Sequence, residues 1–506
     1  MPLIPPSSTR IAPVTTPHPS ITILGLGPGS PDHLTLAAAA ALAAAADVHV
    51  RTTRFPGVAA IPSTATVIAC DDLYAANDAF PDVYAAIAAR IVDAAARGPV
   101  VYAVPGDPAV GETTVGLVRL LAAARGIDVV VLPGVSFIGP TLSALGWDAL
   151  DGVQVADATE LGQRHHPSVD PDKAALVAQV YSRIVASDVK LVLQNQYPDD
   201  HPIYIVSGAG SAAPSVTTAT LSTLDHAEAF DDVTTIGVPP LPRAGSLLSL
   251  ADVIAHLRAP DGCPWDREQT HESLRPYLLE EAYEAVAAID AGDPELLAEE
   301  LGDVLLQVVL HSQLAVEAGD FNLSDVIRHI TEKLIRRHPH VFGDVQADTP
   351  AEVLANWDQL KAAEKAAKAA SIAGDIDGDV GGPVDPFADI PPALPALMRA
   401  QAVQRKSAKL ATDVGPTPNP PPELGEGQAG KAGQGGGPPT AVDALRMAVA
   451  ALDDTTPRAE SIGQALWAVA ALARAWGVDA ETALRDATGD VERRVRANLS
   501  SPGADR

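Results

Sequence analysis

Cysteine, aromatic residues and long apolar runs are all scarce in this sequence, and each scarcity excludes a class of protein. Cys70 and Cys263 are the only two cysteines in 506 residues, which excludes a disulfide-stabilised scaffold. No apolar run reaches the roughly 18 residues that a membrane-spanning helix needs. The first residues, MPLIPPSSTR, lack the basic start and apolar segment of a secretory signal. We therefore predict a soluble, cytoplasmic protein without a membrane partner.

Positive charge is also scarce. Lysine and arginine number 35 against 64 aspartates and glutamates, so the formal net charge is −29. Because binding to a nucleic-acid backbone needs lysine and arginine to neutralise phosphates, we expect no nucleic-acid partner. An acidic protein can still act on phosphorylated substrates when bound metal ions supply the positive charge.

The residues that are present indicate several domains of two kinds. The length allows two to four domains of about 100–200 residues, and the alanine-rich apolar fraction favours helices. Residues 21–240 alternate helical stretches with short β-branched runs, which is typical of α/β layers. The runs expected as strands include ITILGLG (21–27), ATVIAC (65–70), VVYAVPG (100–106), DVVVLPG (128–134) and VKLVLQNQ (189–196). After the proline-rich string at 238–246, the pattern from Leu247 onwards is helical only.

Two of these helical stretches carry clusters of carboxylates among apolar residues. The first cluster contains Glu280, Glu281 and Glu284, and the second contains Glu299, Glu300 and Asp303. At helical spacing each pair of acids three residues apart projects from one side, one turn apart. On the first helix the apolar residues Leu279, Ala282, Tyr283 and Val286 are expected to face a core.

A break between the two helices predicts a hairpin. The sequence AGDP (291–294) interrupts the pattern, and Pro294 suits the first turn of a second helix. In a hairpin the four carboxylates of Glu281, Glu284, Glu300 and Asp303 would converge in a partly buried position. A solvated helix face explains the first cluster taken alone, but burying unpaired acids costs several kcal/mol. Either bound cations or retained protons must therefore offset the charge.

The chemistry of the ligands favours magnesium. Oxygen-only ligands suit Mg²⁺, or alternatively Mn²⁺. A di-iron bundle is the rival, but it needs Glu-x-x-His on paired helices, and neither cluster has a histidine at that spacing. Downstream, Lys333, Arg336 and Arg337 form a basic cluster at helical spacing, which can neutralise a polyphosphate or can form salt bridges with nearby acids.

Residues 247–365 contain, in order, CPWDREQT, the EExxE and ExxD pair, KLIRRHPHVF and VLANWDQLKAAEK. With these motifs the segment resembles the MazG family of all-α nucleoside triphosphate pyrophosphohydrolases. The resemblance implies that Glu281, Glu284, Glu300 and Asp303 bind Mg²⁺ and are catalytic together with Lys333, and that the reaction yields a nucleoside monophosphate and pyrophosphate. It further implies nucleotide binding by Trp265, Lys333, Arg336 and Arg337, and a homodimer formed through the helices.

The end of the chain resembles a second, degenerate MazG repeat. There the string EELGD is replaced by ESIGQ, so that Ser461 stands for Glu300 and Gln464 for Asp303. No EExxE precedes it, and Asp490 falls opposite Lys333. We predict a helical scaffold without catalytic activity, which serves packing, dimerisation or regulation.

The front half carries three loops rich in glycine and proline. The first, GLGPGSPD, is a weak dinucleotide fingerprint because Ser30 stands where the third glycine would be. The other two place Pro-Gly at the carboxyl end of a predicted strand, where α/β folds bind ligands. Together, GLGPGSPDHLT, PGDP and LPGVSFIGPTLSALG resemble the tetrapyrrole (corrin and porphyrin) methylases. That resemblance implies two α/β lobes that bind S-adenosylmethionine, through Gly25, Gly27, Gly29, Gly106, Asp107 and Pro108.

These resemblances predict a multidomain chain with an N-terminal two-lobed α/β methylase-like domain and C-terminal all-α MazG-like domains. The predicted segments are a tail at 1–20, the methylase-like domain at 21–240, a MazG domain at 247–365, a linker at 366–388, an inter-repeat helix at 389–412, a low-complexity linker at 413–440 and the second repeat at 441–500. The principal activity expected is pyrophosphohydrolysis. The alternatives are a methyltransferase regulated by its MazG module, and a nucleotide-binding scaffold without turnover.

Overall fold

The structure of the chain is a computed structural model. It describes residues 20–77, 79–227, 230–353, 356–357, 359–361, 363–364, 387–388, 390–409, 441–450 and 459–488. The predicted tail and the two predicted linkers fall almost wholly outside these residues, as does Asp490. The chain forms two compact units, Met1–Asp348 and Thr349–Arg506.

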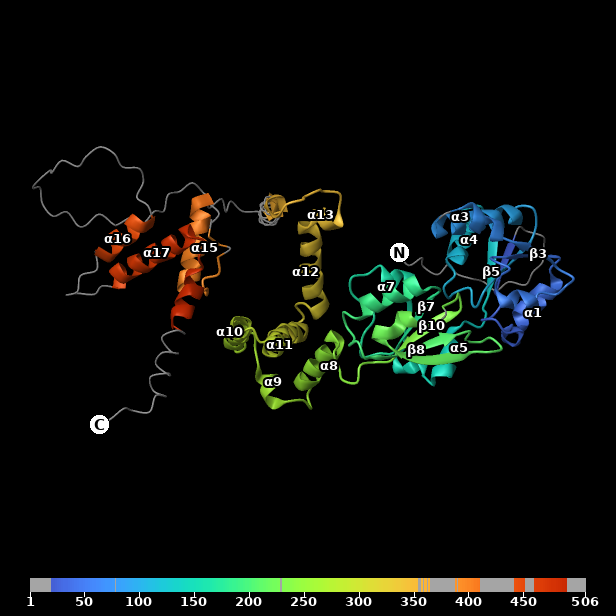
Figure 1. The fold of residues 1–506 in the computed structure, drawn as a ribbon, viewed down its shortest axis with the longest axis horizontal. Helices are drawn as coiled ribbons and strands as arrows, with labels where there is room; N and C mark the ends of the chain where they lie inside the picture. Colours follow the sequence, from blue (N-terminus) through green and yellow to red (C-terminus); the bar gives the residue numbers. More distant parts are fainter. Residues whose placement is uncertain are drawn as a thin grey trace, which may run out of the picture. The chain divides into compact units, whose positions relative to one another are not determined.

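The first unit begins with a parallel five-stranded sheet in the order β3-β2-β4-β1-β5 (Figure 1). Its strands are β1 (Ser20–Gly25), β2 (Asp47–Val50), β3 (Thr66–Ala69), β4 (Val100–Val104) and β5 (Asp128–Leu132). Its helices are α1 (Leu36–Ala44), α2 (Asp71–Ala76), α3 (Phe80–Ala95) and α4 (Thr113–Ala124), whereas α5 (Ile138–Leu145) follows β5 and packs against the second sheet. Residues Ile21 and Ile23 of β1 enter the core that α3 and α4 cover, whereas Leu24 enters the core under α1. A parallel sheet buried on both faces is the expected result for these β-branched runs.

A second five-stranded sheet follows, in the order β6-β7-β10-β8-β9. Its strands are β6 (Gln154–Asp157), β7 (Ala175–Ala178), β8 (Pro202–Ser207), β9 (Ser215–Thr220) and β10 (Thr234–Val238). Only β6 and β7 pair in parallel, and the other neighbours are antiparallel. The helix α6 (Ala158–Gly162), the helix α7 (Arg183–Leu193) and the 3₁₀ helix η4 (Leu221–His226) accompany this sheet. The two sheets confirm the predicted α/β class and its two lobes.

One predicted strand is wrong. Most of the run VKLVLQNQ (189–196) lies in α7, whose first turn is capped by the Ser182 hydroxyl, which accepts from the Val185 amide. The buried residues Ala186, Val189, Val192 and Leu193 recur every three or four positions, which is the period of a helix. The β-branched residues favoured a strand, but the spacing of the apolar residues decides the structure.

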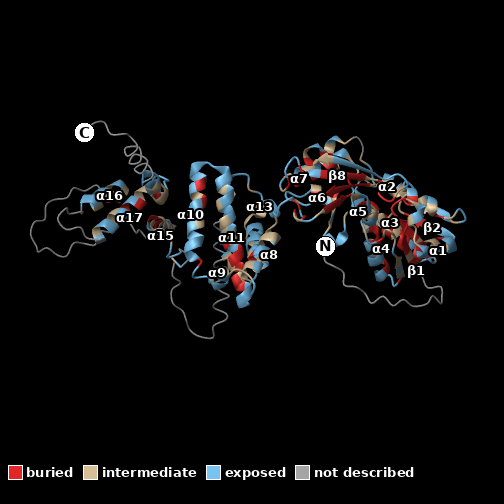
Figure 2. Ribbon diagram, turned by 90° about the horizontal axis from the view of Figure 1, so that it is seen from below, coloured by how far each residue is buried: buried red, intermediate tan, exposed pale blue. Residues whose placement is uncertain are grey.

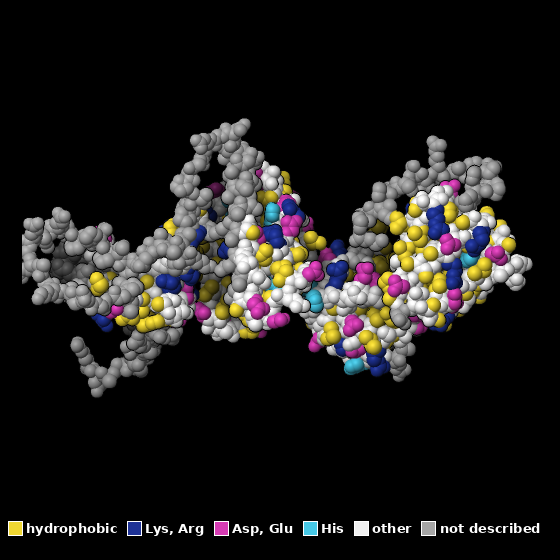
Figure 3. Space-filling model, turned by 90° about the horizontal axis from the view of Figure 1, so that it is seen from above, with side chains coloured by type: hydrophobic (Ala, Val, Ile, Leu, Met, Phe, Trp, Pro, Cys, Tyr) yellow, Lys and Arg dark blue, Asp and Glu magenta, His cyan; other side chains and the backbone are white. Residues whose placement is uncertain are grey.

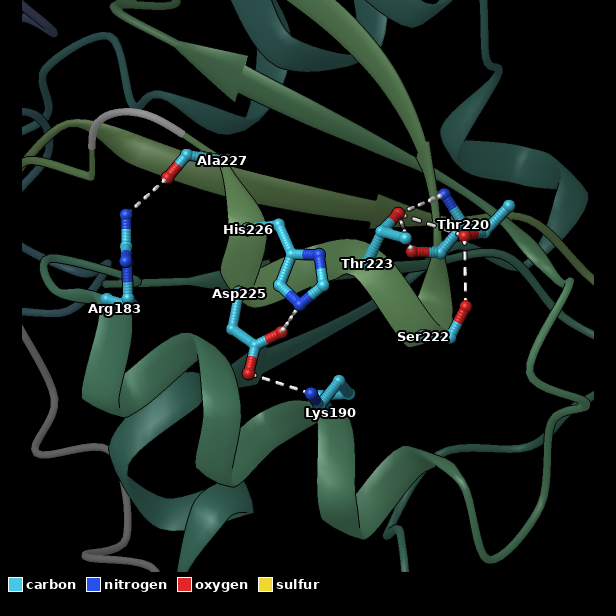
Figure 4. Close-up of polar contacts among 8 residues, drawn as sticks. All are labelled: Arg183, Lys190, Thr220, Ser222, Thr223, Asp225, His226 and Ala227. Atoms are coloured by element: carbon cyan, nitrogen blue, oxygen red, sulfur yellow. Dashed lines mark hydrogen bonds and ion pairs between the residues drawn. The ribbon is translucent and has the colours of Figure 1, made fainter.

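Polar contacts fasten η4 to α7 (Figure 4). The Lys190 ammonium pairs with Asp225 at 2.7 Å, and both side chains are only 16% exposed. His226 lies 3.8 Å from the other oxygen of the same carboxylate. On the same element Thr220 forms a capping box with Thr223. The Asp–Lys–His cluster therefore joins two elements of the lobe.

From Leu247 onwards every described element is a helix, as predicted. In the first unit these are α8 (Leu247–Arg258), α9 (Pro264–Glu268), α10 (Arg275–Ala291), α11 (Pro294–Ala318), α12 (Leu323–Arg337) and α13 (Pro339–Phe342). In the second unit they are α15 (Ala396–Lys409), α16 (Ala441–Ala450) and α17 (Ala459–Ala475). No helix in the described part of the chain is long and apolar enough to cross a membrane.

The hairpin α10–α11 has the predicted turn. Gly292 ends α10 in the left-handed conformation, with φ of 65°, which glycine adopts without strain. The Asp293 carboxylate then accepts from the amides of Glu295 and Leu296, and Pro294 occupies the first turn of α11. The two helices pack against each other side by side (Figure 2).

The predicted core face of α10 is wrong for a single chain. Leu279 and Tyr283 are 54% and 45% exposed, and the buried residues of the helix are Ala285 and Ala288 instead. On α11, Leu301, Leu305 and Val308 are likewise exposed. Hydrophobic side chains also reach the surface of this helical part among charged ones in Figure 3. Apolar periodicity thus predicted a buried face that is largely exposed in this chain.

The second unit packs α15 and α16 against α17. Leu397 and Ala470 belong to its small core. The buried side-chain amides of Gln401 and Gln404 on α15 donate to the carbonyls of Val478 and Trp467, at 2.9 and 3.1 Å. The predicted counterparts of the metal ligands, Ser461 and Gln464, lie on α17.

Candidate functional sites

Three loops meet at one edge of the first sheet because β1 is the neighbour of both β4 and β5. The backbones of Gly27 and Gly106 exchange two hydrogen bonds, of 3.1 and 2.8 Å. A Cβ on Gly25 would lie 2.2 Å from the Gly106 carbonyl oxygen, and a Cβ on Gly134 would lie 2.4 Å from it. Only glycine fits at these two positions, so the close approach of the three loops requires these residues.

Asp107 fastens two of these loops together. One carboxylate oxygen accepts from the Gly134 amide at 2.8 Å, and the other accepts from the Ala109 amide at 2.7 Å. Pro108 packs against the same edge, since its Cδ lies 2.9 Å from a Cβ placed on Gly25. Asp107 thereby shapes the edge where ligands of parallel α/β sheets bind.

The first glycine loop also contacts the second lobe. The Ser30 amide donates to the Gly210 carbonyl at 3.0 Å, and His33 Nδ1 lies 3.0 Å from the same oxygen. Gly29, with φ of 142°, lies beside Ser211. The residues predicted to hold a cofactor therefore lie together, where the first lobe contacts a loop of the second.

The residue that follows β2 and the residue that precedes α4 form a buried ion pair, which was not predicted from the sequence. Arg51 and Glu112 are 2.9 Å apart, and the Glu112 side chain is only 4% exposed. Burial raises the pKa of Glu112 to about 7, although Arg51 opposes the shift. The Thr114 hydroxyl contacts Glu112 at 3.4 Å and Tyr102 at 2.9 Å. No local motif marks this cluster, because β2 and the start of α4 bring it together across the fold.

The second lobe adds a strained residue to the same region. Gln179 has φ of 64°, the only positive value among the described residues other than glycine. Its side chain donates to Asp157 at 2.6 Å, and its Nε2 lies 3.7 Å from a Cβ placed on Gly111 of the first lobe. Strain of this kind is held in place by its surroundings and occurs often at functional sites.

The carboxylate cluster lies between α10 and α11. Oxygens of Glu281, Glu284 and Glu300 all lie within 4.8 Å of one another. Burial, then the charges of Asp303 and Glu284, raises the pKa of Glu281. Burial, then Glu284 and Asp303, raises the pKa of Glu300. The structure thus brings three of the four predicted ligands within reach of one ion, with Asp303 near enough to repel both shifted acids.

The predicted basic residues lie on α12, which packs against α11. Lys333 and Arg337 are half-buried and Arg336 is exposed. Another arginine of this helix, Arg328, forms an ion pair with Asp325 at 2.7 Å. The cluster at Lys333, Arg336 and Arg337 therefore lies on a helix, as its spacing predicted, and that helix packs against α11.

Trp265 lies on α9 and is 54% exposed. Its ring meets Tyr277 of α10 edge to face, with 6.2 Å between the ring centroids. Tyr277 lies four residues before Glu281, on the same face of the helix. An exposed aromatic pair is thus one helical turn from the carboxylates.

Comparisons with known proteins agree with both halves of the chain. The model of the MazG nucleotide pyrophosphohydrolase domain matches residues 269–342, and that of the tetrapyrrole (corrin/porphyrin) methylases matches residues 20–225. The uncharacterised protein YabN of Bacillus subtilis is 39% identical over 395 residues, covering 76% of each chain. The chain belongs to the MazG family, in the YabN-like arrangement.

Other MazG-family relatives match part of the chain. The nucleoside triphosphate pyrophosphohydrolase/pyrophosphatase MazG of Thermotoga maritima is 39% identical over 249 residues, which is 49% of this chain and 84% of the relative. The nucleoside triphosphate pyrophosphohydrolase of Escherichia coli is 40% identical over 251 residues, with the same coverage. The MazG and methylase domains read from the sequence are therefore both present.

Proposed function

We propose that this MazG-family chain is a Mg²⁺-dependent nucleoside triphosphate pyrophosphohydrolase, which releases a nucleoside monophosphate and pyrophosphate. The observation that carries the proposal is the convergence of Glu281, Glu284 and Glu300 within 4.8 Å. The named activities of the Thermotoga maritima and Escherichia coli relatives support it.

The donor set fits a hard divalent cation. All the converging atoms are carboxylate oxygens, which Mg²⁺ prefers, with Mn²⁺ as the alternative. Burial and then the charges of the neighbouring acids raise the pKa of Glu281 and Glu300, and a cation held there would stabilise their charged forms. Glu281, Glu284, Glu300 and Asp303 would hold the ion. When bound, Mg²⁺ polarises phosphate oxygens and makes a water molecule more acidic.

The remaining residues of this site orient the substrate. Lys333, Arg336 and Arg337 of α12 are proposed to neutralise the charge on the departing pyrophosphate. Trp265, together with Tyr277, offers an exposed aromatic surface for the nucleobase, one turn of α10 from the carboxylates. In this proposal the basic residues bind the phosphate end of the nucleotide, and the aromatic pair binds its base.

A second copy of the chain is proposed to cover the apolar face of the hairpin. Leu279, Tyr283, Leu301, Leu305 and Val308 are between 36% and 54% exposed. Exposed apolar side chains that recur at helical spacing on two paired helices are typical of an interface. The proposed homodimer therefore supplies the core that α10 and α11 lack in a single chain.

S-adenosylmethionine binding by the N-terminal domain is a second proposed function, which the three-loop edge favours. Gly25, Gly27, Gly29, Gly106, Asp107 and Pro108 line or shape that edge. The cofactor supplies an electrophilic methyl group, and the loops would hold it through backbone groups. Methyl transfer as the principal activity, with MazG as a regulatory module, remains the alternative to pyrophosphohydrolysis.

Product analysis tests the main proposal. Wild-type protein with Mg²⁺ is expected to convert a triphosphate to monophosphate and pyrophosphate, because cleavage falls between the α and β phosphates. Glu281→Gln should lower turnover at least a hundredfold, whereas Gln464→Ala in the degenerate repeat should leave it unchanged. Wild-type turnover in the Glu281→Gln protein would contradict the assignment of the metal site.

A further inference from the structure

Two histidines form a direct imidazole–imidazole hydrogen bond beside the proposed hydrolase site. His271 precedes α10 and His311 lies on α11, and their Nδ1 atoms are 2.7 Å apart. The ring planes differ by 1°, yet the ring centroids are 5.0 Å apart. The centroids are much farther apart than the two nitrogens, so the rings lie edge to edge and are not stacked face to face. Each Nδ1 therefore points at the other.

This geometry fits a shared proton rather than a shared metal ion. Two imidazoles that chelate one cation direct both lone pairs to a point beside the line between the nitrogens. Here each nitrogen lies in the path of the other, so one Nδ1 donates N–H and the other accepts. The pair is therefore held together only while a single proton lies between the two Nδ1 atoms.

Burial selects the donor of the pair. His311 Nε2 is buried without a hydrogen-bond partner in the described part of the chain, whereas His271 is exposed. A buried N–H without an acceptor is the costlier arrangement, so His311 carries its proton on Nδ1 and leaves Nε2 bare. His311 then donates to His271 Nδ1, and His271 presents its own Nε2–H to solvent.

The hydrogen bond fastens the segment that carries Trp265. Within that segment the Gln269 side chain donates to the Trp265 carbonyl at 3.0 Å and accepts from the Ser273 hydroxyl at 2.7 Å. Leu274, next along the chain, is buried against Val309 and Leu310 of α11. His271 therefore lies in a folded connection between Trp265 and the core of the hairpin.

We propose that His271 and His311 are positioning residues for the pyrophosphohydrolase: their hydrogen bond holds the segment 263–274 on α11 so that Trp265 can receive the nucleobase, and protonation releases it. This inference rests on the proposed function, because it assigns the residues a role at that site. His311 lies eight residues beyond Asp303, about 12 Å along α11, so the pair acts through the segment and not on the phosphates.

Burial and the neighbouring ring determine the ionisation of His311, because the charged groups nearby pair with one another. Burial, then His271, lowers the pKa of His311. On the segment, Glu272 and Arg275 flank His271. On α8, Arg258 pairs with Glu317 of α11 at 2.7 Å, and on α12 Arg328 pairs with Asp325 and Glu332.

The pH dependence follows from this lowered value. A histidine whose pKa falls on folding stabilises the folded segment fully above about pH 6.5, and the contribution is lost as the pH falls through the lower folded value. A further proton on His311 goes to Nε2, which is buried with no acceptor among the described residues, so the charged ring is favoured only when the segment opens and exposes this nitrogen. The substrate KM should therefore rise as the solution is acidified from pH 7.5 to 5.5, with a smaller change in kcat.

Three variants of the full chain separate these effects. His271→Phe removes the hydrogen bond and should raise the KM for a nucleoside triphosphate about fivefold at pH 7.5, with kcat within twofold. His271→Asn keeps an acceptor near the position of Nδ1 and should restore the KM, with the pH profile retained because His311 still titrates. His256→Asn, at another exposed histidine of the domain, should behave as wild type. An unchanged KM and pH profile in His271→Phe would overturn the proposal.

Hydrogen exchange distinguishes failure of this inference from failure of the proposed function. At pH 7.5 without substrate, peptides covering 263–274 should exchange faster in His271→Phe than in wild type or His271→Asn. If wild type releases no pyrophosphate, the proposed function fails, and the exchange result still decides whether the pair fastens the segment. Equal exchange in all three proteins would overturn the inference that the histidine pair holds this segment.

Discussion

At the scale of single residues, Glu112 shows how burial gives an ordinary acid an unusual ionisation. Its side chain is 4% exposed and pairs with Arg51, and burial raises its pKa to about 7. A carboxyl whose pKa rises on folding stabilises the domain below about pH 4.3, its unfolded value, and this contribution is lost as the pH rises towards 7.

The free energy of unfolding of the α/β domain should therefore fall by about 2–3 kcal/mol between pH 4.5 and 8 through this one group. Glu112→Gln keeps an acceptor for Arg51 without a charge, so most of that decline should disappear. Urea denaturation at each pH, read by pulse hydrogen labelling of the β4 peptide, measures it. An equal decline in the variant would show that Glu112 does not carry the pH dependence.

Two groups of residues show how far sequence reasoning reaches. The acids at 281, 284 and 300 could be predicted to converge because a helical period and one turn determine their placement. The His271–His311 bond could not, since the two residues are 40 positions apart and no spacing rule joins them.

At the scale of elements, the three glycine loops were predicted separately, and the sheet order explains why they meet. Strand β1 lies between β4 and β5, so the three carboxyl ends share one edge. What the sequence could not supply is the tie made by Asp107, whose carboxylate accepts from Gly134, 27 residues further on. The wrong prediction of a strand at 189–196 had the opposite cause. The helical period was present in the sequence, but the prediction gave more weight to the β-branched residues.

Asp107→Ala tests the three-loop edge. Loss of the two hydrogen bonds frees the loops from each other, so S-adenosylmethionine should bind about tenfold more weakly by calorimetric titration. Asp107→Asn retains one acceptor oxygen and should bind with intermediate affinity. A control at Asp148, which caps a distant 3₁₀ turn, should leave affinity unchanged when replaced by alanine. No binding heat and no thermal shift with the wild type would count against a cofactor site at this edge.

At the scale of the whole molecule, the uncovered face of α10 and α11 predicts self-association. Leu305 is 41% exposed within that face, and Val253 on α8 is 54% exposed. Leu305→Asp should dissociate the dimer and lower pyrophosphate release at least tenfold, because an aspartate cannot be buried unpaired. Light scattering after size exclusion checks the mass, and Val253→Asp is the control. A wild-type chain that is monomeric at micromolar concentration would contradict the interface.

The domain architecture could be predicted best from the sequence. Glycine- and proline-rich loops after predicted strands indicate the α/β half, and carboxylates at helical spacing indicate the helical half. The exposure of the apolar face of α10 could not be predicted, because apolar periodicity marks a face suited to burial without showing whether the chain buries it. Leu279 and Tyr283 show this directly, being apolar at core spacing and about half exposed.

We propose above all that the α10–α11 carboxylates form the centre of a metal-dependent phosphoanhydride hydrolase. The most direct measurement is pyrophosphate release from a panel of standard and modified nucleoside triphosphates, with and without Mg²⁺, by wild type and Glu300→Gln. We predict release by the wild type only with the metal, and a loss of at least a hundredfold in the variant. Absence of release across the panel, or equal release by both proteins, would contradict the account.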